Sequence, residues 1–421
     1  MLRAGGIALA AAIVLVLALI ASGGSGARKV VAIPAPALTI YTSLPLSAQD
    51  GSRAQDVAVA ERLALEQTGG RAGQFRVVLV TLNDATAQSG TWDPGLAELN
   101  ARRAADDPTT IAYLGELAGG ASAISVPITN QAGILQLSPA DSFTGLTRDG
   151  GSPGEPQRYY PTGQRTFGRL VASDDAQAAA MIRYMRAERV RRVLVLDDQG
   201  SEGQSLALRI VRRAGSRAIT VVDLRALDPR TTDFSSLAAD VSRSGVDAIC
   251  FAGATSSGAP LLFNQLAASD PALKLFGTSG VDDPGFAASL DPLAAARTFI
   301  VSAALPIALW PAAGQSFAAA FRRRFGRDPD PYARYGYEAM RLVLKAIAEA
   351  GPLGNGRAAV VGAVLGSRQR GTVLGDYALS PTGDVSATQF AALRVRAGVS
   401  VAGRPPLISS SARVQRRISG P

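Results

Sequence analysis

Short apolar runs alternate with amphipathic stretches along the chain from Leu38 onward. Each run is rich in Val, Ile, Leu or Phe and is bounded by turn residues, a pattern typical of short buried strands. Apolar positions at helical spacing between the runs predict helices, and this alternation predicts an α/β fold with parallel sheets covered on both faces. The predicted strands are Leu38–Leu44, Arg76–Leu82, Thr109–Leu114, Gly133–Leu137, Arg192–Leu196, Ala218–Val222, Val246–Phe251, Leu273–Gly277 and Thr298–Ala303. The predicted helices include Ala54–Gln67, Asp174–Ala187, Ser205–Ala214 and Phe234–Ser244.

The predicted strands fall into two groups. The segment Asp149–Gly163 separates them, and its glycines and prolines indicate a long exposed loop. Together the strands exceed the usual size of one sheet. Two doubly wound lobes are therefore the predicted architecture.

The N-terminal residues have the layout of a targeting segment. Arg3 precedes an apolar run from Ala4 to Ala21, and small residues follow at Ser22 and Gly23. A cleaved signal peptide over residues 1–26 and an uncleaved membrane anchor at residues 4–21 both fit, because the run is about 18 residues long. No later segment approaches that length without a charge, Gly or Pro, so membrane contact is expected only through this segment. The body is predicted to be exported, either periplasmic or at the cell surface.

The net charge of +9 is concentrated at the two ends of the chain. One cation lies in the leader, and the segment 396–421 carries five arginines and no acid. Gly403–Pro406 interrupts any regular pattern there, so we expect 396–421 to be a basic, disordered tail. The basic residues of the body are scattered among acids, which argues against a nucleic-acid partner.

The composition excludes several kinds of chemistry. The chain has no histidine and a single cysteine, Cys250. Histidine-dependent triads, histidine-ligated zinc, intramolecular disulfides and iron–sulfur clusters are therefore excluded, and we expect no metal and no cofactor. Gly150–Gly154 matches the G-x-S-x-G string of serine hydrolases, but it lies in a Gly/Pro-rich loop rather than a strand–turn–helix. We expect a protein that is not an enzyme; an exported enzyme would need two acids facing each other across the site.

Candidate ligand-binding residues lie in the loops after the predicted strands, where ligands bind in sheets of this type. The Gly-rich turn Gly115–Ser122 leads into a predicted helix, whose free N–H groups suit a carboxylate. The alternative interpretation is that these glycines only let the helix pack closely on the strand. Small polar loops also follow Leu137, Leu196, Phe251 and Gly277.

Several segments, in this order and spacing, resemble the type I periplasmic solute-binding proteins, specifically the leucine/isoleucine/valine-binding branch of ABC importers. The resemblance extends from about Leu38 to Arg394. The segments that carry it are Ser43–Ser47, Leu114–Ser122, Ala132–Pro139, Thr232–Ser235, Val246–Ile249, and Tyr335–Ala339 with the preceding Phe317, Phe321, Phe325, Gly326 and Pro329.

The resemblance implies a Venus-flytrap fold of two lobes joined by three crossover segments. The N-terminal lobe would combine residues 38–167 with 302–374, and the C-terminal lobe would combine 168–301 with 375–395. The implied function is extracytoplasmic capture of a small polar solute, an amino acid or related carboxylate, for an ABC-type importer with a membrane permease as partner. A ligand-sensing ectodomain of the same fold, held by an uncleaved anchor, is the alternative.

The resemblance also assigns candidate ligand-binding positions, with departures from the family pattern. The residue that corresponds to the family's ammonium-binding acid is Ser279, which lacks a charge; Asp282, Asp283 and Asp141 are candidate substitutes. We therefore do not expect leucine itself to be favoured. The candidate ligand-binding residues are Gly119, Gly120, Ala121, Ser122, Asp141, Ser142, Glu202, Thr255 and Ser279.

Overall fold

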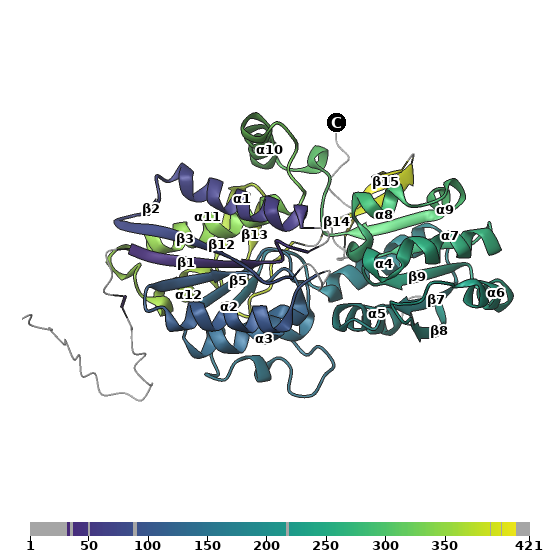
Figure 1. Cartoon of the computed structure of the whole chain (residues 1–421), viewed down its shortest axis with the longest axis horizontal. Coiled ribbons are helices and arrows are strands. Elements are labelled where there is room, and N and C mark those ends of the chain that lie inside the picture. The colour runs from purple at the N-terminus through teal and green to yellow at the C-terminus, as the bar shows by residue number, and fades with distance from the viewer. Residues whose placement is uncertain are drawn as a thin grey trace, which may run out of the picture.

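The computed structural model describes residues 32–33, 37–48, 51–86, 91–215, 219–387, 389–396 and 398–409. The expected targeting segment, residues 1–26, lies outside these ranges, as do residues 410–421 of the expected tail. The described chain forms two large sheets, which lie side by side along the long axis of the molecule (Figure 1). This arrangement confirms the predicted α/β fold with two lobes.

The first sheet has the strand order β2-β3-β1-β4-β5-β6. All neighbouring strands are parallel except β2, which pairs antiparallel with β3. Strand β1 is buried along almost its whole length, as its continuous apolar run predicts. The bounds are β1 Ala37–Leu44, β2 Arg71–Ala72, β3 Phe75–Asn83, β4 Thr110–Leu114, β5 Leu135–Ser138 and β6 Phe167–Arg169.

Helices cover both faces of the first sheet (Figure 1). On one face α2 (Pro94–Asp106) packs against α3 (Gly119–Gln131), and on the other α1 (Ser52–Gln67) packs against α11 (Ala333–Glu349). Helix α11 follows the second lobe in sequence, yet its apolar face lies in the core of the first. The same part of the chain supplies α10 Ala312–Phe325, α12 Arg357–Val364 and the antiparallel pair β12 Arg368–Thr372 and β13 Gly375–Ala378.

The second sheet has the order β15-β14-β11-β10-β9-β7-β8. Strands β7 to β11 run parallel, whereas β14 and β15 are antiparallel additions at one edge. The strands are β7 Arg192–Asp197, β8 Thr220–Ala226, β9 Ala248–Ala252, β10 Lys274–Gly277, β11 Thr298–Ser302, β14 Gln389–Arg396 and β15 Val399–Ser409. The helices are α4 Asp174–Ala187, α5 Ser201–Ala214, α6 Ser235–Ser244, α7 Ala259–Ser269, α8 Pro284–Ala288 and α9 Pro292–Arg297.

The expectation of a disordered tail from residue 396 is wrong over β15. This strand pairs with β14 through residues 399–402 and again through 407–409, and Ile408 is only 7% exposed in the core of the second lobe. The register shifts between Ala391 and Leu393, so that Gly403–Pro406 lies in an irregular stretch of an edge strand. Prolines and glycines are tolerated at such bulges because no ladder hydrogen bond is required of them.

The third crossover between the lobes lies later in the chain than the expected boundary at 374/375. Leu379 and Val385 belong to the core of the first lobe, whereas Phe390 belongs to that of the second. Strand β13 stays with the first lobe because it pairs with β12 and because the Tyr377 hydroxyl donates a 2.7 Å hydrogen bond to the buried Glu338 on α11.

Candidate functional site

The lobes contact each other at the N-terminus of α3. The N-cap residue, Ala118, has no side chain able to accept from the first amides of the helix. The Gly119 amide instead donates to the carboxylate of Glu202, which lies at the start of α5 in the second lobe. A carboxylate at this position is favoured by the unpaired amides and by the helix dipole. The position at which the sequence indicated an anion is therefore occupied by the carboxyl group of the chain's own Glu202.

The glycines of this turn are also required by packing. A Cβ on Gly119 would lie 2.4 Å from Cβ of Phe143, and a Cβ on Gly120 would lie 2.5 Å from Cζ2 of Trp92. The Cβ added to Gly120 would also lie 3.3 Å from Oγ of Ser201 in the second lobe. The absence of side chains therefore allows close packing, as the alternative interpretation of the turn has it, and the Gly119 amide is directed at Glu202.

Two further carboxyls lie near Glu202, each at the carboxyl end of a strand of the first sheet. Asp141 follows β5 and accepts a 2.7 Å hydrogen bond from the Phe143 amide. Asp174 follows β6, begins α4 and accepts a 2.7 Å hydrogen bond from the Ser142 hydroxyl. Both residues are almost completely buried, at 1% and 3% exposure. We call Asp141, Asp174 and Glu202 the carboxyl cluster.

The carboxyl cluster holds its protons more tightly than isolated acids do. Burial, together with the nearby Asp141 and Asp174, raises the pKa of Glu202 to about 8, against the opposing effect of the Gly119 and Gly120 amides. Burial likewise raises the pKa of Asp174 to about 7, although Ser142, Arg169 and Arg209 act in the other direction. Glu202 as a whole residue is exposed, so the burial acts on its carboxyl group, which lies against the α3 N-terminus. The cluster is therefore partly protonated at neutral pH.

Several buried polar atoms around the cluster lack a hydrogen-bond partner among the described residues. They are Oγ of Ser122, Oδ2 of Asp141 and Oδ2 of Asp174. The Ser122 side chain is completely buried in the first turn of α3 and faces Asp141. Unpartnered buried polar atoms are rare in native proteins, so these atoms mark a position that calls for a further polar group.

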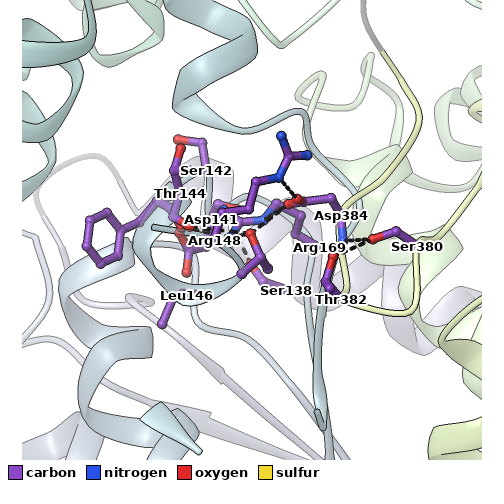
Figure 2. A network of polar contacts seen from close by, with 12 residues as sticks. Ser138, Asp141, Ser142, Thr144, Leu146, Arg148, Arg169, Ser380, Thr382 and Asp384 are labelled. Atoms are coloured by element: carbon purple, nitrogen blue, oxygen red, sulfur yellow. Dashed lines mark hydrogen bonds and ion pairs between the residues drawn. The ribbon is translucent and has the colours of Figure 1, made fainter. Parts of the chain in front are cut away.

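Arg169 holds the loop that carries Asp141 and Ser142. Its guanidinium donates to the carbonyl oxygens of Asp141 at 3.2 Å and Phe143 at 2.7 Å. It also lies 3.2 Å from the carboxylate of Asp384, which accepts from Arg148 at 2.6 Å (Figure 2). Arg169 lies at the first crossover and Asp384 just before the third, so this network connects the candidate site to two of the segments that join the lobes.

A second contact between the lobes involves Arg53 at the start of α1. Its guanidinium donates a 2.8 Å hydrogen bond to the carbonyl oxygen of Asp282 and lies 4.6 Å from the ring centroid of Tyr332. Burial raises the pKa of Asp282 to about 6, and Arg53 counteracts this rise. Asp282, one of the candidate acids, thus lies where the two lobes meet.

The predicted site residues separate into two sets. Gly119, Gly120, Ser122, Asp141, Ser142 and Glu202 surround the α3 N-terminus, whereas Ala121 is completely buried beneath it. Thr255 and Ser279 are instead bonded within the second lobe. The Thr255 hydroxyl donates to Asp283, and Oγ of Ser279 accepts from Nε2 of Gln177 at 2.7 Å and from the Ala303 amide at 3.1 Å.

The sequence analysis did not identify Trp92, Arg53, Asp174 or Arg169. Asp174 and Arg169 flank the first crossover, and Arg53 begins the helix after the first strand, so the rule that ligands bind beyond strand ends could have identified all three. Trp92 gave no such signal, since it follows no predicted strand and only the tertiary structure places it beside Gly120.

Two surface cavities lie away from this site. One, of about 340 Å³, is lined by residues of α3, α12 and the loop before β6, including Asn130, Thr166 and Arg357. The other, of about 690 Å³, lies between α9 and β14 and includes Arg394. Neither is lined by a predicted site residue. Within the described ranges no group of His, Cys, Asp and Glu side chains is arranged to hold a metal ion, and no described helix is long and apolar enough to cross a membrane.

Comparisons with known proteins agree with this architecture. A Leu/Ile/Val-binding protein of Rhizobium johnstonii is 26% identical over 286 residues, which is 67% of this chain and 72% of the relative. A leucine-binding protein from Thermotoga maritima superimposes with a TM-score of 0.75 at 18% identity, over 88% of this chain and 99% of that one. A solute-binding protein of an ABC transporter from Rhodopseudomonas palustris, in complex with benzoate, superimposes with a TM-score of 0.71 at 18% identity, over 89% and 96%.

Residues 40–399 match the periplasmic binding protein family. The match spans both sheets and includes the α3 N-terminus, Glu202, Arg53 and Asp282. The chain therefore belongs to the periplasmic binding proteins, the solute-binding family.

Proposed function

We propose that this protein captures a small polar solute, an amino acid or related carboxylate, between its two lobes and presents it to the permease of an ABC-type importer. The observation that carries the proposal is the convergence of polar groups from both lobes at the α3 N-terminus, where Glu202 of the second lobe meets Gly119 of the first. The names of the relatives, which include leucine-binding and Leu/Ile/Val-binding proteins, support an amino-acid-like solute.

Capture would operate through the equilibrium between open and closed arrangements of the lobes. A solute bound between the lobes stabilises the closed arrangement because only that arrangement contacts it from both sides. The Glu202–Gly119 and Arg53–Asp282 contacts join the lobes in the arrangement described above. A permease that recognises the closed form would then receive only loaded protein.

The family acts outside the cytoplasm, so the chain is an exported protein. We infer that residues 1–26 direct this export. The leader is either a cleaved signal peptide or an uncleaved membrane anchor. The mass of the protein recovered from a secreting host distinguishes them, since cleavage near Ala21–Gly23 removes the leader and an anchored protein keeps it.

The proposed function is tested by thermal-shift screening of the purified protein against amino acids, small carboxylates and amines. A solute at 100 times its Kd adds about 2.7 kcal/mol to the free energy of unfolding, a clearly measurable rise in melting temperature. A screen in which no solute raises the melting temperature would contradict solute capture.

Site variants then test the location of the bound solute. Glu202→Gln should change the affinity for the solute that is found. Glu98→Gln, which alters an exposed acid on α2 away from the lobe contact, should leave it unchanged.

A further inference from the structure

No cation beside the carboxyl cluster belongs to the cluster alone. Arg169 lies 3.9 Å from Oδ1 of Asp141 but closer, at 3.2 Å, to Asp384. Arg209 on α5 faces Asp174, yet it pairs at 2.7 Å with the neighbouring Asp175. In the described part of the chain no salt bridge reaches Glu202. Each nearby cation therefore has a closer carboxylate partner outside the cluster.

In their ionised forms the carboxyl groups of the cluster offer only acceptors. Oδ2 of Asp141 and Oδ2 of Asp174 are buried without donors, and the completely buried Ser122 hydroxyl beside Asp141 is also unpartnered. The amide donors at the start of α3, which would otherwise attract an anion, are already directed at Glu202. A solute entering here thus meets carboxyl oxygens in need of donors and no free anion position.

We propose that the solute is a net cation, an amine or guanidinium compound, whose charged nitrogen group binds to Asp141, Asp174 and Glu202. This inference rests on the proposed function and narrows its solute class. Charge-assisted hydrogen bonds from the cation satisfy the unpartnered oxygens and stabilise the ionised form of the cluster. Glu202, held at the α3 N-terminus, lets the second lobe contact the cation from the opposite side to Asp141 and so favours the closed arrangement.

Binding of a cation should release protons from the cluster. The charged and titratable groups that face it are Arg169 from β6 and Arg209 from α5, in addition to its own members. Because a bound cation lowers the pKa of each carboxyl, groups that are partly protonated near neutral pH lose protons on binding. Affinity for the cation should therefore rise as the pH increases from about 6 to 8.

The experiment uses four probes with the wild-type protein at pH 7.5: L-arginine and putrescine as net cations, L-leucine as a net-neutral amino acid, and benzoate as an anion. We expect arginine or putrescine to raise the melting temperature at concentrations where leucine and benzoate do not. Calorimetry of the stabilising cation in two buffers of different ionisation enthalpy should show proton release.

Two isosteric variants localise the effect. Glu202→Gln and Asp174→Asn should each lower the affinity for the cation by about 10- to 150-fold, the loss of one hydrogen bond between charged groups. They should also reduce the proton release, which a purely structural role would leave unchanged. Glu98→Gln removes the same charge at an exposed position on α2 and serves as the control.

The outcomes separate this inference from the proposed function. Tighter binding of leucine, benzoate or another neutral or anionic solute would overturn the inference and leave solute capture intact. Cation binding with wild-type affinity in both variants would overturn it as well, because the cation would then bind elsewhere. A complete absence of binding across the four probes and the wider screen would contradict both proposals.

Discussion

At the scale of single residues, the buried Glu61 makes the stability of the protein depend on pH. Glu61 on α1 is completely buried, and neither of its carboxyl oxygens has a hydrogen-bond partner among the described residues. Burial raises the pKa of Glu61 to about 8, although the nearby Thr42 hydroxyl acts in the opposite direction. Glu61 is therefore neutral in the folded protein at pH 7, which avoids the cost of an unpaired charge in the core.

Replacing Glu61 by glutamine should flatten the pH dependence of stability. In the unfolded chain Glu61 ionises near its ordinary pKa of 4.5, whereas in the folded protein it does so near 8. The contribution of Glu61 to the free energy of unfolding is fully present below pH 4.5. It is lost as the pH rises to about 8, because the unfolded state releases its proton first. The free energy of unfolding falls in total by an amount on the order of a few kcal/mol.

Chemical denaturation of wild type and Glu61→Gln from pH 4 to 9 measures this effect. We expect the free energy of unfolding of the wild type to fall relative to that of the variant over this range. Parallel pH profiles for the two proteins would show that Glu61 is ionised in the folded state.

Arg169 should be essential for stability, whereas its neighbour Arg148 should not. Arg169 is completely buried, so its removal breaks a buried ion pair with Asp384 and takes the guanidinium donor from the carbonyl oxygens of Asp141 and Phe143, at a cost of about 3–5 kcal/mol. Arg148 pairs with the same Asp384, but its side chain is 54% exposed, and such pairs contribute at most about 1 kcal/mol.

Urea denaturation of Arg169→Met and Arg148→Met tests this contrast. Arg169→Lys should recover little of the loss, because an ammonium cannot reproduce the several directed contacts of a guanidinium. Equal stability of the two methionine variants would mean that the network in Figure 2 does not stabilise the fold.

At the scale of elements, the close crossing of α1 and α11 fixes α11 in the first lobe. A Cβ on Gly336 would lie 2.7 Å from Cγ1 and 2.9 Å from the carbonyl oxygen of Val57. The backbone oxygen cannot move aside without displacing α1, so close packing between the two helices requires glycine here.

Gly336→Ala should therefore destabilise the protein by about 1–3 kcal/mol through overpacking. Gly362 on α12 offers a matched control, since a Cβ there meets no atom within 4 Å. Gly362→Ala should be neutral or stabilising by up to about 1 kcal/mol, because alanine has the higher helix propensity. Thermal denaturation of both variants gives the comparison, and a neutral Gly336→Ala would show that the helices can separate at little cost.

Strand β15 should contribute to the stability of the second lobe. Deletion of residues 403–421 removes the second half of β15 and the buried Ile408, whose side chain alone contributes about 1.5–3 kcal/mol. For a lobe of this size the loss corresponds to several degrees in melting temperature. Deletion of 414–421 removes two arginines but leaves the strand intact, and it should have little effect. An unchanged melting temperature after the longer deletion would restore the expectation of a dispensable tail.

At the scale of the whole molecule, the contacts between the lobes set the balance between closed and open forms. Arg53 crosses from α1 to the carbonyl oxygen of Asp282 in the second lobe. Its side chain is 32% exposed, so we expect its contribution to closure to be about 1 kcal/mol.

Arg53→Ala should shift the ligand-free protein toward the open form and weaken solute binding by roughly fivefold. The radius of gyration from small-angle X-ray scattering should increase, whereas Arg62→Ala, at an exposed position on the same helix, should change neither quantity. A more open variant with unchanged affinity would contradict the link between closure and capture.

The fold could be predicted largely from local patterns. Strands β1, β4, β7 and β9 are short apolar runs buried along almost their whole length, so they were recognisable without knowledge of their partners. Strand β15 was not recognisable, because Gly403–Pro406 argues against a strand. The strand forms because the residues on either side of this stretch pair with β14. The end of the first lobe was also misplaced, because the hydrogen bond that holds β13 there joins Tyr377 to Glu338, 39 residues earlier in the chain.

The sequence by itself determined the alternation of strands and helices, the absence of histidine and disulfide chemistry, and the Gly-rich turn whose amides attract an anion. These features follow from residue identity and short-range spacing. Only the tertiary structure decided that the carboxyl group at that turn is Glu202, that Asp174 joins Asp141 beside it, and that Arg169 lies closer to the carboxylate of Asp384 than to that of Asp141. Whether a charged side chain is paired depends on which side chains the crossovers bring together. These residues lie far apart in the chain, so their proximity is fixed by packing of the lobes and not by any local pattern.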